Sequence, residues 1–173
     1  MDDFLLLDRS GAFSGYSKTE LIDGTVYCMS PQHAEHFTVK NRLYRRIADV
    51  CDALETGLEA WSEGSIGMPA NSVPEPDIFV TSERPVKGLV RPETVVLVIE
   101  VANTTLRFDL DHKARLYAAA GVPEYWVVDV EGRLVHLLWA AGSDGYAERK
   151  TVALGEPIGA VTIGGLLVET SGL

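Results

Sequence analysis

Two acidic residues lie beside stretches that predict β-strands. Asp77 opens the short apolar stretch Ile78 to Val80. Glu100 lies near the end of the aliphatic run Val95 to Val101. If these strands are neighbours, the two carboxylates meet at one edge of the sheet. Two carboxylates and water suit a hard cation such as Mg²⁺ or Mn²⁺, which accepts oxygen ligands.

A lysine follows on a predicted helix. Asp109, Lys113 and Tyr117 are each separated by one helical turn, so they share one face. A carboxylate buried at the end of an aliphatic strand is costly unless a cation compensates it, and Lys113 could point back toward Glu100. Each feature alone has a simpler explanation: Asp77 could occupy a turn, Glu100 could reach solvent, and Lys113 could form a surface ion pair with Asp109.

A β-hairpin is predicted around Asp23 and Gly24. The apolar segments Glu20 to Ile22 and Thr25 to Met29 flank this Asp-Gly pair, which favours a tight hairpin turn. The segment Ser17 to Glu20 also matches a helix capping box, but we favour the hairpin.

A long amphipathic helix is expected next. Ser30 and Pro31 supply an N-cap and a first-turn proline, and Gly57 ends the pattern. Apolar residues recur between them at helical spacing, at Val39, Leu43, Ile47, Val50 and Leu54. The only basic cluster, Lys40 to Arg46, is on this helix and is typical of a solvated face, with contact to phosphates as the alternative.

Most of the remaining chain predicts strands. The run Val95 to Val101 is typical of a central strand covered on both faces. A second helix is expected around Leu106 to Tyr117, ended by Gly121. We expect further strands at Leu58–Trp61, Ile66–Met68, Asp77–Val80, Tyr125–Val130, Leu134–Trp139, Tyr146–Ala153 and Val161–Val168. This order favours an α/β (α+β) sheet with few helices.

Composition restricts the class of protein. The chain has 173 residues, of which 46% are hydrophobic and 23% charged. This is enough for a core of ordinary size, and we expect a single domain over residues 1–173. The net charge of −10 disfavours loose electrostatic adhesion to nucleic acid or anionic membranes. No apolar run approaches the roughly 20 residues of a membrane span, and no secretory signal is visible, so we expect a cytoplasmic protein.

Several segments, taken in order, resemble a known family. They are Glu20–Gly24, Ser30–Pro31 with His36, Pro74–Asp77, Val98–Ala102, Asp109 with Lys113 and Tyr117, and Gly121–Asp129. From about Glu20 to Asp129 the chain resembles the Uma-two family of restriction-endonuclease-like proteins, in the PD-(D/E)XK nuclease superfamily. The most specific part is the Gly-Val-Pro-Glu-Tyr-Trp motif that begins at Gly121.

The resemblance implies a restriction-endonuclease-like mixed β-sheet flanked by helices, with Mg²⁺ or Mn²⁺ as cofactor. The implied activity is hydrolysis of phosphodiester bonds in nucleic acid, with DNA as the expected substrate. Asp77 matches the aspartate of the PD motif and Glu100 the acid of the (D/E)XK motif. Ala102 stands where the superfamily carries its lysine, and Lys113 on the following helix is the matching position.

Other residues enter through the same resemblance. The carbonyl of Val101 is implied as a further metal ligand beside Asp77 and Glu100. Accessory positions of the pattern are Glu20, His36, Asp109 and Tyr117.

Two hypotheses from different classes remain. In the first, the protein is an endonuclease in which a cation activates water and Lys113 orients that water or stabilises the developing charge. In the second, it is a catalytically inactive interaction module that keeps the nuclease fold, as the acidic charge and sparse basic surface suggest. The presence of Asp77, Glu100 and Lys113 together favours the enzyme. A homodimer is also considered, because Ile163 to Val168 suits either a core strand or an interface.

Overall fold

The longest aliphatic run of the sequence forms the strand β5 (Val95–Ala102) in the computed structural model, which describes residues 1–29 and 34–173. A short 3₁₀ turn, η1 (Pro92–Thr94), leads into it. β5 pairs antiparallel with β4 (Ile78–Thr81) on one side and parallel with β6 (Glu124–Asp129) on the other. The prediction of a central strand is therefore confirmed.

A six-stranded mixed sheet is built around β5, in the order β3-β4-β5-β6-β7-β8. The remaining strands are β3 (Glu59–Ser62), β7 (Leu134–Gly142) and β8 (Gly145–Ala153), and every pair except β5–β6 is antiparallel. A parallel pair needs a crossover connection, and here the crossover contains a helix. The predicted mixed sheet flanked by helices is confirmed.

The crossover helix has three consecutive parts. It begins as α3 (Leu106–Phe108), widens into a π-helical turn, η2 (Asp109–Lys113), and continues as α4 (Ala114–Ala119). Gly121 follows with φ of 81°, a conformation that favours glycine, so the predicted end of this helix is confirmed. The π turn contains both Asp109 and Lys113, and such turns are frequent at functional sites.

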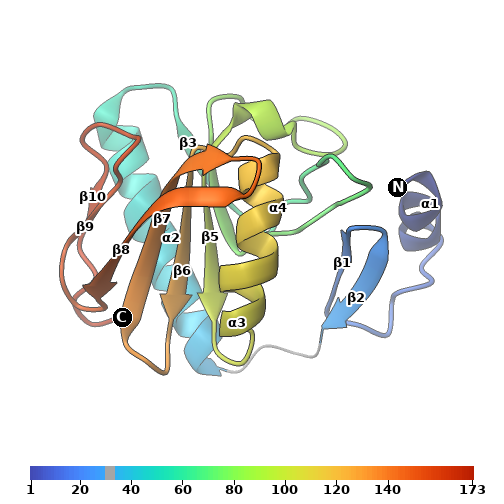
Figure 1. Ribbon diagram of the computed structural model, residues 1–173, viewed down its shortest axis with the longest axis horizontal. Coiled ribbons are helices and arrows are strands. Elements are labelled where there is room, and N and C mark those ends of the chain that lie inside the picture. Colours follow the sequence, from blue (N-terminus) through green and yellow to red (C-terminus); the bar gives the residue numbers. More distant parts are fainter. Residues whose placement is uncertain (30–33) are drawn as a thin grey trace.

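The two faces of the sheet are covered by different helices (Figure 1). The long helix α2 (Ala34–Leu54) packs its apolar stripe on the face that carries Leu97, Ile99 and Val101. The crossover helix packs on the opposite face with Val98 and Ala102. Because side chains alternate along a strand, Glu100 points to the side of the crossover helix.

The basic residues of α2 are not simply solvated, as the sequence favoured. The predicted cap at Ser30 and Pro31 lies outside the described residues. Arg42 donates to the carbonyl of Gly172 at 2.6 Å, and Arg46 donates to those of Glu169 and Ser171 at 2.6 and 2.9 Å. These guanidinium groups bind the C-terminal segment instead of facing solvent alone, because its carbonyls lie against this side of the helix.

The predicted hairpin forms outside the large sheet. β1 (Lys18–Ile22) pairs antiparallel with β2 (Thr25–Met29), and the turn residues Asp23 and Gly24 have φ of 48° and 78°. Positive φ at both positions is typical of a type I′ hairpin turn, so the alternative of a helix cap at Ser17 is wrong. A short helix that was not expected, α1 (Asp2–Arg9), precedes the hairpin (Figure 1).

Two predicted strands are wrong. Ile66 to Met68 makes only isolated bridges, Ile66 to Val90 and Met68 to Ser72. Within 161–168 only β10 (Leu167–Val168) forms, paired with β9 (Ile158–Gly159). Gly165 has φ of 83°, which turns the chain, while Ile163 and Leu166 are buried in the core without a ladder.

None of the described helices is long and apolar enough to cross a membrane.

A buried glutamate explains part of the Gly-Val-Pro-Glu-Tyr-Trp motif. Glu124 opens β6 and has no exposed surface. It accepts hydrogen bonds from the Trp126 indole at 2.7 Å and from the backbone N–H groups of Val161 and Thr162 at 2.9 and 2.7 Å. The Thr162 hydroxyl adds another at 2.8 Å. One carboxylate therefore fastens the segment before β10 to the central sheet.

We expect Glu124→Ala to lower the free energy of unfolding by about 2–4 kcal/mol, because it leaves the buried Trp126 indole and the N–H groups of Val161 and Thr162 without their acceptor. Urea unfolding followed by circular dichroism measures this. Glu148→Ala, on the exposed part of β8, is the matched control and should change stability by no more than about 0.5 kcal/mol. Equal effects of the two variants would contradict the fastening role of Glu124.

Candidate active site

The two predicted carboxylates face one another across two strands. Ile78 of β4 pairs with Ile99 of β5, so Asp77 and Glu100 are the next residues on each strand and lie opposite each other. Each is 3% exposed. Both line a cleft of about 680 Å³ whose walls come from the β1–β2 hairpin, the first turns of α2, and the start of the crossover helix. We call this the carboxylate cleft.

Glu100 is held by two residues of the crossover helix. The Lys113 amine donates to Oε1 of Glu100 at 2.8 Å, and the Tyr117 hydroxyl donates to the same oxygen at 2.8 Å. The expectation that Lys113 points back toward Glu100 is confirmed. Lys113 and Asp109 are 2% and 3% exposed, so the alternative of a surface ion pair is wrong. Asp109 accepts a hydrogen bond from the Thr105 hydroxyl at 2.6 Å.

Asp77 is held from the other side of the cleft. Its Oδ2 accepts a hydrogen bond from the backbone N–H of Val101 at 2.9 Å. Nε2 of His36, in the first turn of α2, lies 3.3 Å from the same oxygen, and Nζ of Lys40 lies 3.9 Å from Oδ1. The predicted residues His36 and Val101 are therefore beside Asp77. Nδ1 of His36 is buried without a hydrogen-bond partner among the described residues.

Glu20 enters the same cluster from the hairpin. Its Oε1 accepts hydrogen bonds from the Glu75 backbone N–H at 2.7 Å and from Lys113 at 3.0 Å. The carboxylate has no exposed surface. Lys113 thus lies between Glu20 and Glu100 and joins the hairpin to the central strand.

Sequence reasoning missed two lysines at this site. Lys18 of β1 lines the carboxylate cleft, and its Nζ lies 3.9 Å from Oε1 of Glu20. Lys40 of α2 lies 2.5 Å from Glu63 as well as near Asp77. Spacing could have found both. Lys18 is two residues before Glu20 on one face of a strand, and Lys40 is one helical turn after His36.

Burial and neighbouring charges give the carboxyl groups of Asp77 and Glu100 different pKa values. Although burial opposes it, the hydrogen bond from His36 and the charge of Lys18 hold the pKa of Asp77 at about 2. Burial raises the pKa of Glu100 to about 7, against the opposing charges of Lys113 and Lys18. Burial alone would lower the pKa of Lys113, but Glu100 and Glu20 raise it above its ordinary value, so this amine is charged.

The oxygen atoms of the cleft fit a hard cation. Among residues 1–29 and 34–173, no three His, Cys, Asp or Glu side chains are arranged to hold a metal ion. Mg²⁺, however, is usually held by one or two carboxylates and completes its shell with other oxygens. Oδ1 of Asn103, which lines the cleft beside Asp77 and Glu100, is buried and has no hydrogen-bond partner among those residues. Such an unpaired oxygen is a suitable further ligand.

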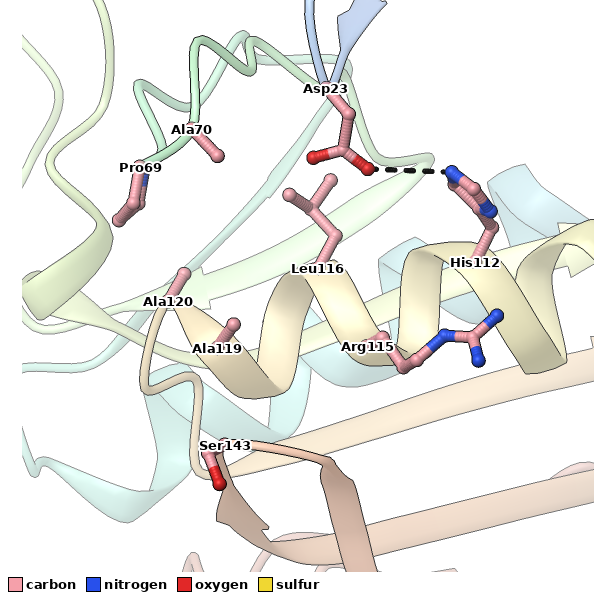
Figure 2. Close-up of a pocket in the computed structure, with 9 residues that line it drawn as sticks. All are labelled: Asp23, Pro69, Ala70, His112, Arg115, Leu116, Ala119, Ala120 and Ser143. Carbon is pink, nitrogen blue, oxygen red and sulfur yellow. Dashed lines mark ion pairs between the residues drawn. The ribbon is translucent and has the colours of Figure 1, made fainter.

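A second pocket lies on the other side of the crossover helix. It has a volume of about 260 Å³, and Figure 2 shows its one ion pair, from His112 to Asp23 at 3.4 Å. Leu116, Ala119 and Ala120 make much of its wall (Figure 2). This pocket has one acidic residue and lacks the paired carboxylates of the cleft. The carboxylate cleft is therefore the candidate active site.

The mixed sheet with its crossover helix, and the two acids that it brings into one cleft, allow a comparison with known proteins. The fold is shared with a structure from Anabaena variabilis ATCC 29413, titled a putative nuclease belonging to DUF820. The TM-score is 0.63 at 15% identity, and the match covers 82% of this chain and 80% of that chain. The chain belongs to the Uma2 family, described as "Putative restriction endonuclease", whose family model matches residues 1–166. No match was found among the curated proteins.

We expect the metal-free protein to lose stability relative to Glu100→Gln as the pH rises from about 4.5 to 7. The folded pKa of Glu100, about 7, is above its ordinary value of 4.5, so its contribution is complete below pH 4.5 and is lost as the pH approaches 7. Across this range the wild type should lose on the order of 3 kcal/mol of unfolding free energy relative to Glu100→Gln. Urea unfolding in EDTA across this range measures it.

The matched control is Glu148→Gln, which removes an exposed glutamate of β8. Its stability curve should follow that of the wild type. Parallel curves for the wild type and Glu100→Gln would show that the Glu100 pKa is not raised.

Proposed function

We propose that this protein is a metal-dependent endonuclease that hydrolyses phosphodiester bonds of nucleic acid, with DNA as its substrate. The observation that carries the proposal is that Asp77, just before β4, and Glu100 of β5 line one cleft, with Lys113 at 2.8 Å from Glu100. Membership of a family described as restriction endonucleases supports hydrolysis as the reaction.

The proposed cofactor is Mg²⁺ or Mn²⁺, held by Asp77 and Glu100 with the carbonyl of Val101 and Oδ1 of Asn103 as further oxygen ligands. When bound, such a cation supplies Lewis-acid activation of the phosphoryl group and lowers the pKa of a water molecule. Two carboxylates suit this role because they provide hard oxygen ligands and leave positions for water and phosphate.

The protein residues around these acids orient them. Lys113 and Tyr117 fix Oε1 of Glu100, which leaves its other oxygen for a ligand. The Val101 N–H and His36 fix Oδ2 of Asp77 in the same way. Residues that orient a ligand are part of a metal site, and their loss commonly lowers affinity or activity. In this proposal Lys113 acts on the substrate through Glu100, and Glu20 acts through Lys113.

We expect millimolar Mn²⁺ to raise the Tm of the wild-type protein, because a ligand that binds only the folded state stabilises it. At a Mn²⁺ concentration of about 100 times the Kd, the free energy of unfolding increases by roughly 3 kcal/mol, which corresponds to a rise in Tm of about 5–10 °C. Asp77→Asn should abolish the shift. Differential scanning fluorimetry measures it, and Asp144→Asn, an exposed aspartate of the β7–β8 turn, is the control that should keep it.

The activity itself is tested with supercoiled plasmid and with labelled single-stranded and duplex oligonucleotides in Mg²⁺ or Mn²⁺. The proposal expects cleavage by the wild type and at least a 100-fold loss in Asp77→Asn and Glu100→Gln. If the wild-type protein is folded and saturated with Mn²⁺ and cleaves none of these substrates, the result favours the catalytically inactive interaction module.

We expect binding of DNA to require a divalent cation and to depend weakly on salt. The net charge of −10 repels a polyanion, and Arg42 and Arg46 are engaged with the C-terminal segment, so few side chains displace counterions. Fluorescence anisotropy of a labelled duplex in Ca²⁺, at several salt concentrations, measures this dependence. Tight binding in EDTA with a steep salt slope would contradict it.

A further inference from the structure

Lys113 is poorly placed to contact a substrate. Its amine donates to Glu100 at 2.8 Å and to Oε1 of Glu20 at 3.0 Å, and it lies 3.0 Å from Oε2 of Glu20. An ammonium group has three donor hydrogens, and two of them are engaged in these hydrogen bonds to buried carboxylates. With 2% of its surface exposed, Lys113 would have to give up a buried carboxylate to reach a phosphate.

Lys18 is in the opposite situation. It extends from β1 into the wall of the carboxylate cleft, and its side chain is 9% exposed. Within the described part of the chain, its one polar contact is the 3.9 Å ion pair with Glu20, which is too long for a hydrogen bond. The Lys18 ammonium therefore keeps donors available at the cleft surface. A ligand that enters the cleft can therefore accept hydrogen bonds from Lys18 without displacing a protein partner.

Lys40, which lies behind Asp77, is committed to the protein. Lys40 donates to Glu63 at 2.5 Å and lies 3.9 Å from Asp77. A phosphodiester that enters this cleft meets several carboxylates, so it needs a cationic donor as well as a metal ion. Lys18 offers that donor beside Asp77 and Glu100, since all three line the same cleft.

We propose that Lys18 is the residue that binds the scissile phosphodiester, and that Lys113 is a positioning residue that holds Glu100 and Glu20. This inference rests on the proposed function of the same cleft. Lys18 donates charge-assisted hydrogen bonds to the nonbridging oxygens of the phosphate, an interaction that a neutral side chain does not replace. The β1–β2 hairpin thereby supplies the substrate contact that the six-stranded sheet lacks.

Binding of a short fluorescein-labelled single strand in Ca²⁺, which supports binding without hydrolysis, tests the assignment. Lys18→Met should weaken binding roughly 10- to 100-fold, the value of one hydrogen bond to a charged group. The same variant should keep the Mn²⁺-dependent rise in Tm, because it leaves Asp77 and Glu100 in place. Lys18→Arg should retain part of the affinity, since the charge remains.

Two further variants separate the roles. Lys113→Met should reduce the Mn²⁺-dependent rise in Tm, because Glu100 loses its partner, whereas Lys18→Met should not. Lys150→Met, on the exposed part of β8, is the matched control and should leave binding unchanged. Unchanged binding in Lys18→Met overturns the assignment. An equal loss of binding in Lys18→Met and in Lys150→Met overturns it too.

A measurement on the wild type keeps the test independent of folding. In ¹³C-lysine-labelled protein, the ε-methylene resonance assigned with Lys18→Arg should shift when the oligonucleotide is added, and that of Lys150 should not. An unshifted Lys18 resonance at saturation overturns the inference. If the wild type cleaves nucleic acid while Lys18→Met cleaves equally well, the inference fails and the proposed function stands. If the wild type neither binds nor cleaves, both fail.

Discussion

The structure depends on one costly interaction, the burial of the Glu100 carboxylate at the end of an aliphatic strand. A buried charge must be paired and hydrogen-bonded, and the partners here are Lys113 and Tyr117. Both belong to the crossover helix, so this helix must lie over the β5 face on which Glu100 points. The parallel pairing of β5 with β6 follows from the same crossover. The chemistry of one side chain and the topology of the sheet are thus linked.

The cluster is also a compromise between stability and reactivity. Glu20, Glu100 and Lys113 replace what could have been apolar packing with ions that have little access to water. Such groups rarely add stability over hydrophobic residues of similar size, so their presence favours a functional reason. The separation of the pKa values of Asp77 and Glu100 has the same origin, because one carboxyl receives direct hydrogen bonds from His36 and Val101 while burial dominates the other.

Local patterns predicted much of this fold. The Asp23-Gly24 turn, the aliphatic β5 and the helix end at Gly121 were readable because short-range turn chemistry and periodicity decide them. The segment 161–168 was misread as a strand because an apolar composition is equally compatible with a buried loop fastened by Glu124. At the site, the strand-end acids were predictable, whereas the signal for Lys18 was only the strand face that it shares with Glu20, since the docking of the hairpin brings both residues to the cleft.

The hairpin β1–β2 is joined to the rest of the protein differently from the strands of the large sheet. It forms its own two-stranded sheet, and its backbone meets the remainder through the Leu21–Val73 bridge and a hydrogen bond from the Gly24 N–H to the Asn71 carbonyl at 3.2 Å. Yet it contributes Glu20 and Lys18 to the cleft. The site therefore depends on a hairpin that takes no part in the strand pairing of the six-stranded sheet. Because Ile22 of the hairpin is buried in the core, a change in the Leu21–Val73 contact disturbs both cleft residues and part of the core packing, while the strand pairs of the large sheet do not involve the hairpin.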